Sequence, residues 1–149
     1  MSYVSKIVSF ETTLEVRDTC LCLGAQRAAR ALARRFDEAL RPAGLTNQQF
    51  SLLMALNRPE PARMAPVASL LAMDRTTLTA ALKPLERRGL LRVEASPSDR
   101  RRRQVRLTEA GHAALLEALP IWRQTHADLE AGLPALDVEA LRTSLRALS

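Results

Sequence analysis

The sequence predicts a mainly α-helical protein with a small β-hairpin, and three observations predict it. Hydrophobic residues make up 47% of the 149 residues and aromatic residues only 3%. The apolar residues are therefore mostly aliphatic and rich in Leu and Ala, which are strong helix formers. Apolar residues recur three or four positions apart over most of the chain. Only after Gly89 does the period change to two, as in a strand. The length fits a single domain, which we place at residues 1–149.

The first long helix is expected over residues 14–41. Its apolar residues share one helical face, and Pro42 and Gly44 end it. That face consists of Leu21, Ala25, Ala28, Leu32, Phe36 and Ala39.

Two shorter helices are expected next. Thr46 is an N-cap, and Gln49 three positions later completes a capping box. The segment 57–63 (NRPEPAR) predicts a proline-rich loop, and a short helix over 66–71 follows it.

A further helix is expected from Asp74, its N-cap, to Gly89, with Leu78 and Leu82 on its inward face. Pro84 lies inside this helix. Because proline removes one backbone hydrogen bond and crowds the preceding turn, we expect a kink there, without an end to the helix.

The alternating segments around Leu91 and Val105 predict two strands joined by a loop of about nine residues. Thr108 then caps a helix whose apolar stripe is interrupted at Pro120, and Asp137 caps the last helix.

The order helix, short helix, helix, hairpin over residues 46–107 is that of a winged helix-turn-helix. In such modules the second helix of the turn motif presents its N-terminal side chains to DNA bases or phosphates. The alternative is an ordinary capped helix with a polar, solvated face. The candidate DNA contacts on it are Arg75, Thr76, Thr77, Thr79 and Lys83.

Four consecutive arginines, Arg100, Arg101, Arg102 and Arg103, occupy the predicted hairpin loop. Adjacent like charges repel, so a folded chain gains nothing internally from them, whereas neutralised DNA phosphates release counterions. The formal net charge of +6 agrees with an anionic partner. Asp99 is placed to orient the Arg101 guanidinium by a fork-type pair. A plain solvated loop is the alternative for this run.

The chain resembles the MarR family of bacterial transcription regulators through the segments DRTTLT, LE, GLL and DRR, followed by Thr108 and Gly111 at the family's spacing. The resemblance covers about residues 20–149. It implies a homodimer that binds a pseudo-palindromic operator on double-stranded DNA, usually as a repressor, and that responds to a small ligand, often an anionic aromatic. Ala80 departs from the family, whose members usually carry Arg, Asn, Gly or Ser there; its methyl makes no bidentate base contact, although it could contact a thymine methyl.

Residues 14–42 and 108–149 are expected to form the dimerisation helices. Val138, Leu141, Leu145 and Leu148 share one face of a terminal helix that needs a partner surface. The alternative is that these faces pack within one chain.

The ligand and sensor residues are less well defined by sequence. Conceivable pocket residues are Arg27, Arg30, Phe50 and His112, with ordinary core or surface roles as the alternative. Cys22 resembles the sensor cysteine of the peroxide-responsive branch, so a redox-sensing regulator is an alternative function. Because the activating tyrosines are replaced, we expect Cys20 and Cys22 to be buried, inert thiols. Positions two apart on one helix also point to opposite faces, which excludes a disulfide between them there.

Other function classes find little support. No nucleophile elbow, phosphate loop or metal-binding motif is present, so we expect no enzyme, no metal and no cofactor. The sequence shows no signal peptide or membrane-length apolar run, which predicts a cytoplasmic protein without a membrane partner. A non-DNA basic interaction module is the remaining alternative.

Overall fold

The computed structural model describes residues 7–149, and the chain divides into two compact units, residues 1–35 and 36–149. The first unit contains α1 (Phe10–Thr19) and most of α2 (Leu21–Leu40), whose last turn belongs to the second unit. Within the described residues, no helix is long and apolar enough to cross a membrane.

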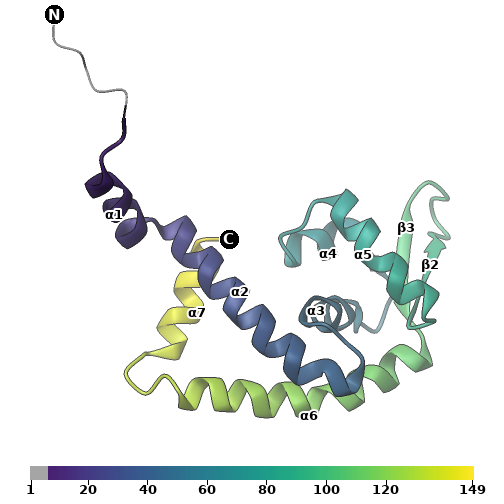
Figure 1. The fold of residues 1–149 in the computed structure, drawn as a ribbon. Helices are drawn as coiled ribbons and strands as arrows, with labels where there is room; N and C mark the ends of the chain where they lie inside the picture. The colour runs from purple at the N-terminus through teal and green to yellow at the C-terminus, as the bar shows by residue number, and fades with distance from the viewer. Residues whose placement is uncertain (1–6) are drawn as a thin grey trace, which may run out of the picture. The chain divides into compact units, whose positions relative to one another are not determined.

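The prediction of one helix over 14–41 is wrong in two respects: α1 already begins at Phe10, and Cys20 separates α1 from α2 (Figure 1). Cys20 has an extended backbone with ψ of 109°, while its N–H still donates to the carbonyl oxygen of Val16. Its sulfur accepts the N–H of Leu23 at 3.4 Å and so supports the first turn of α2. The apolar spacing continues across this residue, which is why periodicity did not reveal the break.

The second unit holds the hydrophobic core. After the end of α2 its elements are η1 (Arg41–Ala43), α3 (Asn47–Leu56), β1 (Ala62–Arg63), α4 (Met64–Leu70), α5 (Arg75–Arg87), β2 (Leu91–Ala95), β3 (Arg103–Leu107), α6 (Glu109–Ala131) and α7 (Val138–Ala147). Helix α3 packs on α6, and α4 packs on α5. Five of the ten residues of α3 are buried, and Leu52, Leu53 and Leu78 are fully inaccessible to solvent. The helix-turn-helix is thus anchored in the core through one face of each helix.

The predicted N-caps at Thr46, Asp74, Thr108 and Asp137 are confirmed. Each side chain accepts a backbone N–H three residues later, and Thr46 and Gln49 complete the capping box. These short bonds satisfy donors at the helix N-terminus that have no partner within the helix.

The hairpin is confirmed, but the sheet has a third strand and a shorter loop than predicted. The strand order is β1-β3-β2, with Ala62 opposite Val105 and Arg63 opposite Gln104. Strand β1 lies at the end of the predicted proline-rich loop, and two residues are too few to show alternation. Pairing of Ala95 with Arg103 leaves residues 96–102 as the loop, instead of about nine residues.

Both internal prolines are accommodated. Helix α5 continues through Pro84 to Arg87, and α6 continues through Pro120 to Ala131. The prediction that the helix continues through Pro84 is confirmed. The kink expected at Pro84 stays a prediction. The short helix expected over 66–71 begins at Met64 instead.

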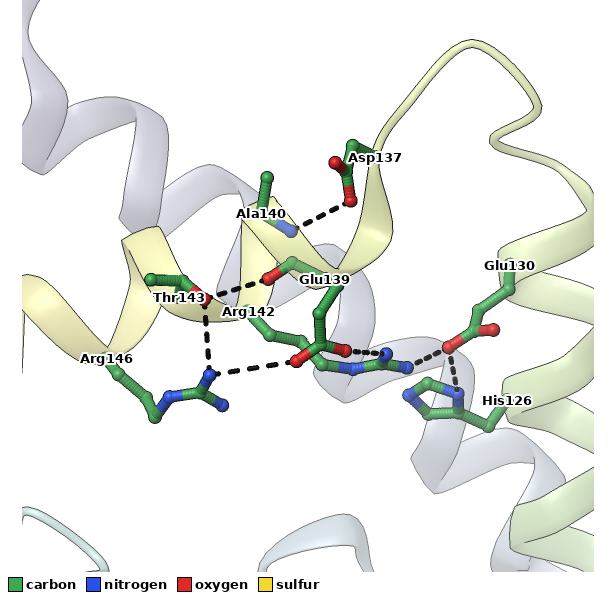
Figure 2. A network of polar contacts seen from close by, with 8 residues as sticks. All are labelled: His126, Glu130, Asp137, Glu139, Ala140, Arg142, Thr143 and Arg146. Atoms are coloured by element: carbon green, nitrogen blue, oxygen red, sulfur yellow. Dashed lines mark hydrogen bonds and ion pairs between the residues drawn. The ribbon is translucent and has the colours of Figure 1, made fainter.

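An ion-pair network joins the end of α6 to α7 (Figure 2). Glu130 lies between His126, whose Nδ1 is 3.3 Å away, and Arg142, which donates to the same carboxylate oxygen. Arg142 also binds Glu139 at 3.0 Å. Because Arg142 holds one carboxylate from each helix, it fixes α7 to α6 across the intervening turn. The His126 ring also packs against two aromatic rings: its centroid is 5.0 Å from that of Trp122 and 6.2 Å from that of Phe36.

Candidate nucleic-acid interface

The start of α5 is held rigidly by Asp74. Its Oδ1 accepts the backbone N–H of Thr77 at 2.7 Å, and its Oδ2 accepts the Thr77 hydroxyl at 2.9 Å. The backbone hydrogen bond from Thr77 and then the side-chain one lower the pKa of Asp74 from its ordinary value, because they favour the ionised carboxylate. The cap therefore stays charged and bound near neutral pH.

The outer face of α5 carries the predicted contact residues. Thr76, Thr79, Ala80 and Lys83 are exposed, whereas Leu78 and Leu82 are buried. The hydroxyls of Thr77 and Thr79 are already donated within the protein, that of Thr79 to the carbonyl oxygen of Arg75 at 2.8 Å. They remain available to a partner only as acceptors, which the sequence did not reveal.

The loop between β2 and β3, residues 96–102, is closed by its own backbone. The N–H of Ser96 donates to the carbonyl oxygen of Arg102 at 2.8 Å. Asp99 accepts the backbone N–H of Arg101 at 3.0 Å, and its second oxygen lies 3.6 Å from Nε of Arg102. The predicted fork between Asp99 and the Arg101 guanidinium is therefore wrong: the carboxylate binds the main chain of Arg101 and the side chain of Arg102.

The hairpin is fixed to the end of α5 by Thr108. Its hydroxyl donates to the carbonyl oxygen of Gly89 at 2.6 Å and accepts the N–H of Gly111 at 3.1 Å. A Cβ at Gly111 would collide with the backbone carbonyl of Leu90, so only glycine allows this close approach. Gly89 has a φ of +72°, where a side chain would be strained. These contacts set the position of the hairpin loop relative to α5.

Together these elements form a cationic groove with a volume of about 690 Å³. It lies between the hairpin loop, β1 and the start of α4 and α5. Its lining residues are Arg63, Met64, Ala65, Pro66, Ser69, Arg75, Arg101, Arg102 and Arg103. The lining holds five arginines and no acidic side chain, so positive potential accumulates in a concave surface that suits a phosphate backbone.

The structure thus brings together residues that the sequence predicted separately, Arg75 and the loop arginines. All four consecutive arginines are exposed, but only Arg100, Arg101 and Arg102 lie in the loop, because Arg103, which was predicted to lie there, begins β3 opposite Ala95. Arg100, Asp99, Thr76, Thr79 and Lys83 are not part of the groove lining. Arg63 was missed, because its strand is too short to be recognised in the sequence and its place opposite Gln104 depends on sheet pairing.

Two apolar cavities border α3 and α6. The larger, about 380 Å³, is lined by Phe50, Ser51, Met54, Ala55, Leu70, Leu119 and Trp122. Its Phe50 and Trp122 rings stack with centroids 6.1 Å apart. The smaller, about 200 Å³, includes His112 and shares Met54 and Leu119 with the larger. Phe50 and His112 therefore each line a cavity, and a role for them in ligand binding stays a prediction.

The other predicted ligand and sensor residues lie on α2. Arg27 and Arg30 line a groove of about 530 Å³ on this helix, together with Gly24, Ala28, Ala31 and Arg34. Cys22 is exposed and Cys20 half-buried, so the prediction of two buried thiols is wrong for the chain by itself. The argument against a disulfide also fails, because Cys20 lies outside the helix. Among residues 7–149, no three His, Cys, Asp or Glu side chains are grouped to hold a metal ion.

The chain is similar to known proteins in sequence and in fold. Residues 45–102 match the MarR family. The chain is 36% identical over 80 residues to the HTH-type transcriptional repressor NicR of Pseudomonas putida, an alignment that covers 54% of this chain and about half (51%) of NicR. Among solved structures, it is similar to the M. tuberculosis transcriptional regulator MOSR in complex with DNA, with 40% identity, a TM-score of 0.79 and coverage of 87% of this chain and 92% of that one. BpsR of Bordetella bronchiseptica, whose DNA binding is regulated by 6-hydroxynicotinic acid, aligns with 29% identity, a TM-score of 0.77 and coverage of 87% and 93%. Matching sequence over nearly the whole of MOSR, and matching architecture, lead to one conclusion: the chain belongs to the MarR family of DNA-binding transcriptional regulators.

Proposed function

We propose that this protein is a homodimeric repressor that binds a pseudo-palindromic operator and is released by a small molecule. The observation that carries the proposal is the groove in which Arg63, Arg75 and the loop arginines converge without an acidic side chain. Each phosphate neutralised there releases counterions, which favours binding to duplex DNA.

The proposed docking places the two DNA-contacting elements in different grooves. Helix α5, with exposed Thr76, Thr79 and Lys83, enters the major groove, and Arg101 at the hairpin tip enters the adjacent minor groove. The other arginines that line the cationic groove, Arg63, Arg75, Arg102 and Arg103, contact the phosphates between the two DNA grooves. In a two-fold dimer the two α5 helices would lie about one DNA turn, roughly 34 Å, apart.

The dimer is proposed to form through residues 14–42 and 108–149. Helix α7 exposes Leu141 and Leu145 by 38% and 51%, and Leu148 at its C-cap is 63% exposed. In the other segment, Val16 of α1 is 52% exposed. Several exposed apolar side chains on one helix face are typical of a surface that a second copy of the chain covers.

The effector is proposed to bind in the apolar cavity between α3, α4 and α6. An aromatic ligand can stack on Trp122 or Phe50, with Ser51 supplying a polar contact. Because Phe50 belongs to α3 and Leu70 to α4, a ligand between them bears directly on the helix-turn-helix. Such a regulator acts on chromosomal DNA and hence in the cytoplasm, and binding rather than catalysis is its activity.

The test is operator selection followed by competition. A random-duplex library is bound to the full chain, and the enriched sequence is measured by fluorescence anisotropy at several salt concentrations. We expect the enriched duplex to bind at least about a thousandfold more tightly than a scrambled duplex of equal length. Equal binding to both duplexes would contradict the proposal and favour a non-specific basic module.

A second candidate, regulation by oxidants through Cys22, is supported by one observation. The Cys22 thiol is exposed, and Nε2 of Gln26 donates a hydrogen bond to its sulfur at 3.1 Å. Peroxide should then release the operator from the wild type but not from Cys22→Ser. Equal release from both proteins, or from neither, would exclude this candidate.

A further inference from the structure

The outer face of α5 lacks a fork-shaped hydrogen-bond donor at its centre. Thr76, Thr79, Ala80 and Lys83 are spaced three, one and three positions apart and are all exposed. With 3.6 residues per turn they form one stripe, directly opposite the buried Leu78 and Leu82.

The chemistry of this stripe is restricted by bonds within the protein. The Thr79 hydroxyl donates its hydrogen to the carbonyl oxygen of Arg75 at 2.8 Å. It can therefore offer a partner only lone pairs and its methyl group, and Ala80 next to it offers only a methyl group. Arg75, which carries a planar fork of donors, lies at the helix start and lines the cationic groove with the hairpin arginines.

The centre of the stripe lacks the side chains that usually read purines. Guanine is read in the major groove by bidentate contacts from Arg or Lys, and adenine by Asn or Gln. None of these side chains is present between Thr76 and Lys83, so the one such group in the stripe, Lys83, lies at its end. Thymine is the one base that presents a methyl group there, and small apolar side chains contact it.

We propose that Ala80, with the methyl group of Thr79, reads thymine through its 5-methyl group at the centre of each operator half-site. The inference rests on the proposed function, because it concerns which base α5 selects once it lies in the major groove. Burying one methyl group is worth about 0.8 kcal/mol, so each contacted thymine methyl should contribute about fourfold to affinity.

The experiment uses the operator enriched by selection with the full-length protein. Each thymine under α5 is replaced in turn by deoxyuridine, which removes only the methyl group. The thymine–adenine pairs at the same positions are also replaced by cytosine–guanine pairs and by 5-methylcytosine–guanine pairs. We expect deoxyuridine to weaken binding about fourfold at one or two central positions, and 5-methylcytosine to bind more tightly than cytosine there, because it restores the methyl group.

Two variants assign the contact to named side chains. Ala80→Gly removes the methyl group at the centre of the stripe, and Thr79→Ser removes the methyl group but keeps the hydroxyl bonded to Arg75. In Ala80→Gly the affinity ratio between thymine and deoxyuridine should fall from about four towards one at the position that Ala80 contacts. General weakening of the helix by glycine affects both duplexes equally and cancels in the ratio, while Thr79→Ser tests the neighbouring contact without a glycine.

The outcomes separate this inference from the function on which it rests. A strongly enriched operator with no thymine under α5, or with thymines whose methyl groups do not affect binding, would overturn the inference and leave DNA binding intact. A thymine-to-deoxyuridine ratio unchanged in both variants would also overturn it. If no sequence is enriched at all, the proposed function itself fails.

Discussion

The carboxylate of Asp99 accepts the backbone N–H of Arg101 at 3.0 Å, so the tip of the hairpin loop is held by a main-chain contact. The only ion pair that Asp99 makes among the described residues is with Arg102, at 3.6 Å. The guanidinium of Arg101 is thereby left exposed at the edge of the cationic groove, beside Arg102 and Arg103. Asp99 shapes the turn, and the Arg101 guanidinium makes no ion pair among the described residues.

This arrangement predicts different effects for the two residues. Arg101→Ala should weaken operator binding strongly and lower the slope of log affinity against log salt by about one unit, because one cationic contact in the minor groove is lost. Asp99→Ala should weaken binding through a looser turn while the slope does not fall, since no cation is removed. Anisotropy titrations at four salt concentrations measure both. An equal loss of slope in the two variants would contradict these separate roles.

Arg63 is predicted to contact DNA although it lies outside the helix-turn-helix and the hairpin loop. Arg63→Ala should reduce affinity about tenfold and the salt slope by about one unit for operator and scrambled duplex alike, as expected for a phosphate contact. Arg58→Ala is the matched control, because Arg58 precedes β1, is exposed and is absent from the groove lining. The same loss in both variants would indicate a general charge effect instead.

The apolar face of α7 is predicted to hold the dimer. Leu141→Asp combined with Leu145→Asp should weaken dimerisation by at least about a hundredfold, because two leucines lose apolar burial and two charges would be buried. Sedimentation velocity over a range of protein concentrations measures the change. Thr143→Asp, on another face of the same exposed helix, should leave the dimer intact. A dimer that persists in the double variant would show that α7 is not its interface.

Ala72 in the turn between α4 and α5 adopts a φ of +51°, a conformation that strains any residue with a Cβ. Ala72→Gly should therefore raise the free energy of unfolding by about 0.5–1 kcal/mol, after the greater chain entropy of glycine is included. Ala81→Gly, inside α5, should instead lower it by about 1 kcal/mol. Urea unfolding at one fixed protein concentration compares them, and a similar decrease in both would rule out strain at Ala72.

Asp37 is predicted to contribute to stability in a pH-dependent way. It accepts the backbone N–H and the side-chain amide of Asn47, both at 2.7 Å, and joins the end of α2 to the start of α3. The backbone hydrogen bond and then the side-chain one lower the pKa of Asp37 from its ordinary value. A lowered pKa in the folded state means that its contribution is fully present above the unfolded value of about 3.9 and is lost as pH falls through the folded value.

Unfolding measured between pH 7 and pH 2 tests this prediction. Asp37→Asn keeps an acceptor oxygen but cannot titrate, so its stability should decline less steeply than that of the wild type below about pH 4. Asp74 also has a lowered pKa, and it titrates in both proteins, so its effect cancels in the comparison. Parallel curves would show that Asp37 does not contribute.

Local sequence signals determined the helices, their caps and the hairpin. Thr46, Asp74, Thr108 and Asp137 all cap helices as predicted, because a cap depends on a side chain and a backbone N–H only three residues apart. The exposed candidate DNA-contact residues on α5 and the arginine run were likewise visible in the sequence, as were the family segments that carry the resemblance. These features depend on neighbours within about one helical turn.

The three-dimensional structure decided which groups lie next to one another, through strand pairing, side-chain rotamers and backbone angles. The inclusion of Arg63 in the groove depends on β1 pairing with β3, and two residues of strand leave no periodic signal. The partner of Asp99 and the occupied hydroxyls of Thr77 and Thr79 depend on rotamers that residue identity does not fix. The break at Cys20 keeps the apolar spacing of a continuous helix, so only the backbone angles reveal it. Residue identity therefore specified which charged and polar groups this protein has. Strand pairing specified which of them lie together, and local side-chain conformation specified which hydroxyl donors are already used.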